Sequence, residues 1–298
     1  MNQKQFVLLL LLVLFVGCST PPLKTQSVSR IHTEDQADAS FGVIDAHLHA
    51  RFLGTPERNS KIPMTREELF QEFKDAGVVG AVSHTAEGGE NYQPNLQKDS
   101  IVQCYGVGEE IPLKTIEAGL KSKKYGCIKI YLGYVHRFAY SKEYRRVYDL
   151  AQKYDVPVVF HTGDTYSAQA KLKYSDPLTI DEVAVDYPKV TFVIAHCGNP
   201  WIESAAEVGY KNPNVYLEGS AFMIGDLSKY SHEQLDRLVV KPLTWIFEFL
   251  DDPNKLMFGT DWPLTRIGPY LEVFKRAIPK EHWRKVFHDN AARVFGLK

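Results

Sequence analysis

Asp45-Ala46-His47-Leu48-His49 is the first of four short segments that together decide the fold of this chain. The other three, in chain order, are Phe160-His161-Thr162-Gly163, Ala195-His196-Cys197-Gly198 and Phe258-Gly259-Thr260-Asp261-Trp262-Pro263. Each segment places a metal-binding side chain at the end of an apolar, strand-like run. Side chains two residues apart on a strand project to the same side, so His47 and His49 can bind one ion together. The four segments predict one metal site that is assembled from distant parts of the chain.

Around these segments, apolar runs alternate with amphipathic ones, and this alternation predicts a parallel sheet with crossing helices. Strands are expected at 42–47, 78–83, 101–107, 126–131, 156–161, 190–196, 214–219 and 255–261. Helices are expected at 65–76, 112–123, 141–154, 179–186, 200–209 and 231–250, with a final pair at 269–277 and 281–295. The segment 84–100 shows no convincing helix. An outer helix is therefore expected to be missing there or to be replaced by a loop.

The order and spacing of the four metal-binding segments resemble the amidohydrolase superfamily. The closer resemblance is to the amidohydrolase-2 branch, which includes the aminocarboxymuconate-semialdehyde decarboxylase-like enzymes. It extends over residues 41–298 and implies an α/β fold, a (β/α)8 TIM barrel, which typically needs about 250 residues. In that family an HxH pair ends strand 1, single histidines end strands 5 and 6, and an aspartate ends strand 8. The resemblance therefore implies that His47, His49, His161 and Asp261 bind a metal ion.

Asp261 and His196 are the residues to which the resemblance gives catalytic roles. Asp261 is expected both to bind the ion and to take a proton from the attacking water. In relatives the position of His196 either binds a second metal ion or acts as an acid or base, and we favour the second role. One divalent ion is expected as cofactor. Imidazole and carboxylate ligands suit zinc, with manganese or another first-row ion as the alternative.

Lys129 lies within the apolar run Cys127-Ile128-Lys129-Ile130-Tyr131, although lysine is rarely buried without a partner. In two-metal members of the superfamily, a strand-4 lysine is carbamylated and bridges the ions. Alternatively, Lys129 binds an acidic substrate group or pairs with a carboxylate such as Glu109 or Glu218. The sequence leaves the choice between a mononuclear and a binuclear site open.

Residues 1–17 carry a different signal, because one lysine precedes the apolar run 6–16 and Gly17-Cys18 follows it. This pattern is typical of a signal peptide, and its end resembles a bacterial lipobox, although Phe15 departs from the usual aliphatic residue. Cys18 is therefore expected to be lipidated, with ordinary signal cleavage as the alternative. Residues 18–40 are polar and predict a disordered tether. The protein is expected in a bacterial cell envelope, anchored in the outer membrane and facing the periplasm.

The composition limits the classes of partner and the chemistry of the remaining cysteines. The formal net charge is -1, and lysine and arginine are spread along the chain, so a nucleic-acid-binding surface is not expected. Hydrophobic residues make up 44% of the chain, enough for one large core. Cys104, Cys127 and Cys197 are scattered over predicted strands and are expected to be small core residues without disulfide bonds.

The ligand set favours hydrolysis of an ester, lactone or amide bond of a small molecule by metal-activated water. Decarboxylation by the same kind of site is the first alternative, and a lipid-anchored binding protein without activity is the second. A carboxylated substrate would suit cations on the loops at the carboxyl ends of the strands. Five loop residues are candidates for substrate contacts: Arg51, His136, Arg137, Trp201 and Arg266. The sequence does not identify the substrate or the oligomeric state.

Overall fold

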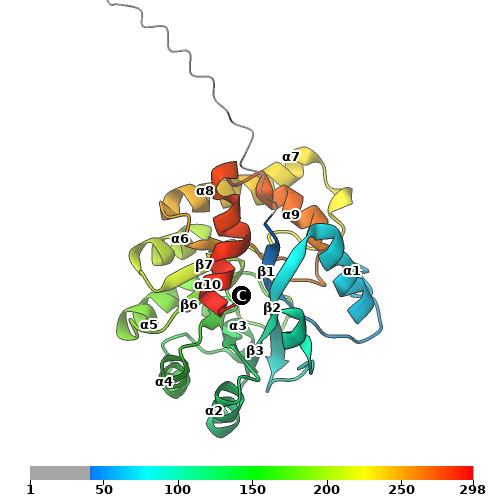
Figure 1. Ribbon diagram of the computed structural model, residues 1–298. Coiled ribbons are helices and arrows are strands. Elements are labelled where there is room, and N and C mark those ends of the chain that lie inside the picture. Colours follow the sequence, from blue (N-terminus) through cyan, green and yellow to red (C-terminus); the bar gives the residue numbers. More distant parts are fainter. Residues whose placement is uncertain (1–40, 298) are drawn as a thin grey trace, which may run out of the picture. The chain divides into compact units, whose positions relative to one another are not determined.

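The computed structural model describes residues 41–297, in which eight parallel strands form a barrel surrounded by helices (Figure 1). The strands are β1 Val43–Leu48, β2 Val78–Glu87, β3 Ile101–Val107, β4 Cys127–Ile130, β5 Val158–Phe160, β6 Phe192–Ile194, β7 Val215–Glu218 and β8 Leu256–Met257. Each strand pairs with the next one in the chain. The amide of Ala46 donates to Phe258 O at 2.9 Å, and that of His49 donates to Trp262 O at 2.7 Å, so β8 returns to β1. The predicted (β/α)8 barrel is confirmed.

The helices lie outside the ring of strands. Their bounds are α1 Arg66–Ala76, α2 Leu113–Lys121, α3 Leu132–Val135, α4 Arg145–Tyr154, α5 Ile180–Asp186, α6 Ile202–Lys211, α7 His232–Leu235, α8 Lys241–Leu250, α9 Ile267–Lys275 and α10 Asn290–Phe295. Thr65 begins α1 because its hydroxyl accepts from the amide of Glu68, and Gly77 ends it with a φ of 68°. Only α3, a single turn after β4, was not expected from the sequence.

The connection between β2 and β3 has no α-helix, as expected for the segment 84–100. It contains one short helical turn, Leu96–Asp99, and β2 continues to Glu87, four residues beyond the predicted strand end at 83. This extension matters for the site, because it makes His84 part of a strand and not of a loop.

The inside of the barrel is filled by apolar side chains below the level of the candidate site. Ile44, Val82, Val159 and Met257 belong to this inner cluster, together with Phe295 of α10. Figure 1 shows α10 in red, in front of the centre of the barrel. The helix therefore closes the end of the barrel at which the strands begin, and a larger cluster packs the strands against the outer helices.

Two cysteines correct a prediction, because Cys104 and Cys127 form a disulfide bond. The residues face each other in the register of β3 and β4, and both are fully buried. The sequence could not show this pairing, because it depends on the register of two strands. Cys197 is a buried free thiol, as predicted.

The predicted signal peptide, Cys18 and the tether lie outside the described residues. Within 41–297, none of the helices combines the length and the apolar character needed to cross a bilayer.

Candidate metal centre

His47 and His49 reach the inside of the barrel because β1 is irregular near its end. The register between β1 and β2 shifts between Asp45 and Leu48. The buried carboxylate of Asp45 holds this turn: it accepts from the amide of His47 at 3.0 Å and from the hydroxyl of Thr260 at 2.6 Å. Asp45 therefore ties the end of β1 to the segment that carries Asp261.

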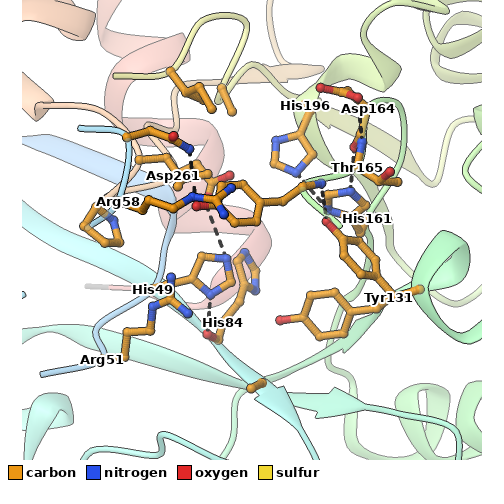
Figure 2. Close-up of a pocket in the computed structure, with 18 of the residues that line it drawn as sticks. His49, Arg51, Arg58, His84, Tyr131, His161, Asp164, Thr165, His196 and Asp261 are labelled. Carbon is orange, nitrogen blue, oxygen red and sulfur yellow. Dashed lines mark hydrogen bonds and ion pairs between the residues drawn. The ribbon is translucent and has the colours of Figure 1, made fainter. Parts of the chain in front are cut away.

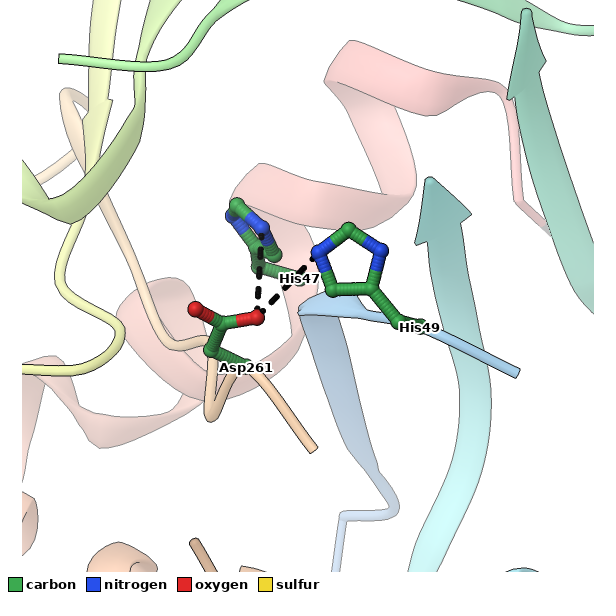
Figure 3. A group of neighbouring side chains, drawn as sticks. All are labelled: His47, His49 and Asp261. Atoms are coloured by element: carbon green, nitrogen blue, oxygen red, sulfur yellow. Dashed lines mark ion pairs between the residues drawn. The ribbon is translucent and has the colours of Figure 1, made fainter. Parts of the chain in front are cut away.

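Each of the two imidazoles is oriented through its Nδ1. His47 Nδ1 lies 2.6 Å from Oε1 of the buried Glu218, and His49 Nδ1 lies 2.9 Å from the carbonyl oxygen of His84. Both partners are acceptors, so both Nδ1 atoms carry the proton and both Nε2 atoms present a lone pair. Figure 3 shows these Nε2 atoms facing Asp261. Oδ1 of Asp261 lies 3.7 Å from His47 Nε2 and 3.3 Å from His49 Nε2.

This arrangement fits a bound cation. Oδ1 of Asp261 is buried and accepts no hydrogen bond from residues 41–297. Burial, followed by the positive charge of Lys129, holds the pKa of His47 well below its usual range, so this ring is neutral. Lone pairs that converge in a buried place repel one another unless a cation lies between them. The carboxylate and carbonyl behind the rings are also the partners that orient metal-binding histidines.

The backbone turns sharply where Asp261 and His196 enter the site. The φ angles of these residues are 62° and 60°, in the left-handed region that non-glycine residues rarely adopt. Such conformations are concentrated at functional sites. Gly259 lets the backbone before Asp261 lie close to Glu218 and His47. A Cβ at this position would lie 2.6 Å from Glu218 Oε2 and 2.9 Å from His47 Cβ, too close for any other residue.

The fourth predicted ligand, His161, contacts His196 and does not join the group of three. Nδ1 of His161 lies 3.1 Å from Nε2 of His196. Nε2 of His161 donates to the carbonyl of Asp164 at 2.8 Å. Burial and then the charge of Lys129 lower the pKa of His161 to about 3, and burial also lowers that of His196. His196 Nδ1 contacts the hydroxyl of Ser220 at 2.8 Å. Metal binding by His161 and the acid–base role of His196 stay predictions.

Lys129 is fully buried on β4, as the sequence indicated. Its Nζ has no hydrogen-bond partner within the described part of the chain. Burial lowers the pKa of Lys129 to about 8, although the negative charges of Glu218 and Asp261 act against this shift. Of the two carboxylates that the sequence offered as partners, Glu218 is the one that influences Lys129.

A cavity of about 660 Å³ opens above this group at the carboxyl ends of the strands. Figure 2 shows His161 and His196 on one side of the cavity, with His49, Arg51 and His84 on the other. Aromatic and apolar side chains complete the lining: Tyr131, Tyr134, Tyr166, Phe222, Met223 and Tyr230. The cavity is large enough for a small organic molecule.

Two loops that line the cavity contact each other. One follows β1 and the other follows β5, on the opposite side of the barrel. The hydroxyl of Tyr166 donates to Glu57 Oε1 at 3.0 Å and accepts from Asn59 Nδ2 at 3.2 Å. The guanidinium of Arg58 lies 5.2 Å from the centre of the Tyr166 ring. We call Glu57, Arg58, Asn59 and Tyr166 the clasp.

The predicted substrate-contact residues fall into two groups. Arg51 lines the cavity, whereas His136, Arg137, Trp201 and Arg266 do not. Arg266 instead contacts Glu68 at 2.7 Å and Glu72 at 2.9 Å, and Arg137 donates to the carbonyl of Glu109. The prediction that Arg266 and Arg137 face the substrate is not supported, because carboxylate and carbonyl groups outside the cavity hold them.

Among the residues of the site that were not predicted as site residues are His84, Glu218 and Arg58. His84 could have been found from its spacing, because Val82 faces the inside of the barrel and side chains two apart share a face. Glu218 ends an apolar strand in the same way as the predicted ligands. No sequence signal marks Arg58, whose position depends on its contact with the ring of Tyr166.

Comparisons with known proteins agree with the fold and give it a family. A family model described as amidohydrolase matches residues 65–297, which begins after the His47 and His49 segment. The comparison with curated proteins found no match.

Solved structures with the same fold include an amidohydrolase from Burkholderia multivorans with bound zinc, with 14% identity and a TM-score of 0.62 over 87% of this chain and all of that one. A probable 2-pyrone-4,6-dicarboxylic acid hydrolase from Acinetobacter baumannii, with citric acid bound, has 13% identity and a TM-score of 0.63 over 86% of this chain and 100% of that one. A 5-carboxyvanillate decarboxylase from Sphingomonas paucimobilis has 13% identity and a TM-score of 0.58 over 87% and 100% of the two chains. At these identities the likeness shows a shared fold.

Proposed function

Because the chain belongs to the amidohydrolase-2 family, we propose that it is a metal-dependent hydrolase that cleaves an ester, lactone or amide bond of a small molecule. The observation that carries the proposal is Oδ1 of Asp261, which accepts no hydrogen bond within residues 41–297 and faces the Nε2 atoms of His47 and His49 next to the cavity. His47, His49 and Asp261 would hold the ion, with His161 as the predicted fourth ligand. A bound divalent ion polarises a carbonyl group and activates water for attack.

The residues of the chain would then move the proton and hold the reacting groups. In this proposal Asp261 accepts the proton of the attacking water and passes it to the leaving group. His196, which lines the cavity beside His161, orients the water or the substrate. Glu218 accepts a hydrogen bond from Nδ1 of His47 and so keeps this ring in place. It also accepts from the backbone amide of His196 at 2.9 Å.

Decarboxylation is the second candidate, because Arg51 and Arg58 line the cavity and neither forms an ion pair with a carboxylate within residues 41–297. A guanidinium without such a partner can hold a substrate carboxylate. A decarboxylase would need that carboxylate next to the metal ligands, whereas a hydrolase would need a carbonyl group there.

Metal content tests the first part of the proposal. Purified protein should contain close to one equivalent of zinc or manganese, and His47→Ala should lose most of it because an incomplete ligand set binds weakly. His232→Ala, at an exposed histidine on α7, is the matched control and should keep the metal. If the purified protein instead contains two equivalents of metal and Lys129→Ala loses one of them, the site is binuclear and bridged. Wild-type protein that binds neither metal would contradict the proposal.

Product analysis tests the reaction type. With a panel of esters, lactones, amides and carboxylic acids, hydrolysis places oxygen from labelled water in the product. Release of carbon dioxide with solvent deuterium at the carbon atom would establish the decarboxylase instead. Metal binding without either reaction would favour the inactive binding protein.

We also propose that the protein is a lipoprotein of a bacterial cell envelope. Support comes from the apolar run 6–16, the Gly17-Cys18 junction and the polar segment 18–40 in the sequence. Its partners would be a small-molecule substrate and the membrane that holds its lipid anchor.

A further inference from the structure

His84 is a buried histidine whose ring nitrogens have no hydrogen-bond partner among residues 41–297. Its exposed fraction is 2%, and the residue lines the main cavity. The ring centre lies 4.2 Å from that of His47 and 5.9 Å from that of His49. The residue thus stands next to two of the proposed metal ligands.

The main chain and the side chain of His84 have different surroundings. The carbonyl oxygen accepts from His49 Nδ1, so the backbone of β2 helps to orient a proposed ligand. The imidazole itself forms no comparable contact. A neutral imidazole has one donor and one acceptor nitrogen, and a buried polar group without partners destabilises the folded protein. The fold alone gives no reason for a histidine here, since an apolar side chain would suit the place better.

The grouping of potential ligand atoms does not single out His84 as a metal ligand. Two groups of potential ligand atoms come close together in this part of the molecule, namely His47 with His49 and Asp261, and His47 with His196 and Glu218. His84 belongs to neither group. His84 lines the cavity on the side opposite His161 and His196, so the cavity is the place from which a partner for its ring can come (Figure 2).

We propose that His84 is a substrate-binding residue, whose ring N–H donates to an acceptor oxygen of the substrate, a carboxylate or carbonyl oxygen. This role rests on the proposed function, because it assumes that the cavity holds the substrate. Lys129, whose charge acts on His84, also has an unpartnered nitrogen in this wall of the barrel. The two groups favour a substrate that carries oxygen atoms with negative charge on the side of β2 and β4.

His84→Leu separates this role from a structural one. The substitution removes an unpartnered polar group, so the midpoint of thermal unfolding should rise. It should also lower kcat/KM at least 100-fold and leave the metal content unchanged. His288→Leu is the matched control, because His288 is a partly buried histidine that does have a partner, the carbonyl of Gly42 at 2.6 Å. This control should lower the midpoint of unfolding and keep the activity.

A second variant and a second measurement keep the proposal falsifiable. His84→Asn retains a donor in a smaller side chain and should keep more activity than His84→Leu. Calorimetric binding of glutarate, a small dicarboxylate used as the probe and measured on the metal-loaded protein, does not depend on turnover, and it should be at least tenfold weaker in His84→Leu than in the wild type. Equal binding, unchanged kcat/KM, loss of metal or a lower unfolding midpoint in His84→Leu would each overturn the proposal. Because glutarate binding is read without catalysis, this result stands even if the hydrolase proposal fails.

Discussion

Glu218 is the residue that connects the parts of the candidate site. It is fully buried at the end of β7, and its two carboxylate oxygens contact β1 and the segments that follow β6 and β7. Oε1 lies 2.6 Å from His47 Nδ1 and 2.9 Å from the amide of His196, and Oε2 lies 2.9 Å from the amide of Ser220. All these partners are donors, so the site needs a group with two acceptor oxygens.

Glu218→Gln should therefore loosen the site without unfolding the barrel. The amide has one acceptor oxygen, and its NH2 group would face a donor. Affinity for zinc should fall roughly 10–100-fold, the usual effect of removing a partner that orients a metal ligand. Competition with a chelator measures this, and Glu207→Gln on the exposed face of α6 is the control. Unchanged affinity in Glu218→Gln would show that His47 does not depend on Glu218.

Individual site residues could be predicted from the sequence where each stands at the end of a predicted strand. His47, His49 and Asp261 could be found because each follows an apolar run, and the structure brings them together. Arg266 could not be placed, because its direction depends on Glu68 and Glu72 of α1, far away in the sequence.

The β1–α1 loop contributes Arg58 and Asn59 to the lining of the cavity, and the hydrogen bonds of Glu57 hold this loop in shape. The buried carboxylate accepts from the amides of Asn59 and Ser60 at 2.7 and 2.6 Å, in addition to the Tyr166 hydroxyl. Burial alone would raise the pKa of Glu57, but these hydrogen bonds outweigh it and lower the pKa. The charged form is thus the one that the clasp stabilises.

The stability that Glu57 contributes should depend on pH. A carboxyl whose pKa is lower in the folded state stabilises the protein above its unfolded pKa of about 4.3, and the contribution disappears as the pH falls through the folded value. Wild type should exceed Glu57→Gln in unfolding free energy by about 1–2 kcal/mol at pH 7, with the difference shrinking below pH 4. Urea unfolding of both proteins at each pH measures this difference. The pH dependence that the other carboxyl groups contribute is the same in both proteins and therefore cancels. A difference that stays constant down to pH 3 would exclude this role of Glu57.

The pair β3 and β4 is crosslinked inside the barrel by Cys104 and Cys127, 23 residues apart. Replacing both cysteines by alanine should lower the unfolding free energy by roughly 3 kcal/mol, because the unfolded chain gains freedom. Alkylation of denatured, unreduced protein followed by mass spectrometry should leave these two residues unmodified, whereas Cys197 should react. Modification of Cys104 without reduction would contradict the disulfide.

Strands were predicted better at their beginnings than at their ends, whereas most helices ended where they were predicted to end. The predicted strand 255–261 is β8, which ends at Met257, because the chain leaves the sheet to bring Asp261 back towards His47. Apolar character continues through Phe258 and cannot show where pairing stops. Register is equally invisible in one sequence, which is why the disulfide was missed.

The whole molecule combines a predicted anchor with a barrel, and the anchor can be tested directly. Cys18→Ser should abolish fatty-acid labelling and release the protein from the membrane fraction, since the thiol is the proposed acylation site. Cys197→Ser is the control and should be labelled like the wild type. Equal labelling of the Cys18→Ser protein would rule out lipidation at Cys18. The barrel itself was predictable because the four metal-binding segments resemble those of the amidohydrolase superfamily, whereas the alternation of apolar runs alone predicted only a parallel sheet with crossing helices.

The closed base of the barrel leaves one route by which substrate can enter and product can leave the cavity. Ile44, Val82, Met257 and Phe295 fill the space below the ligands, so a molecule in the cavity cannot continue through the barrel. Whatever enters past the clasp has to leave the same way. A retained product therefore blocks the next substrate, so inhibition by the product should be competitive, and the rate of product release should follow how readily the contacts of Tyr166 break.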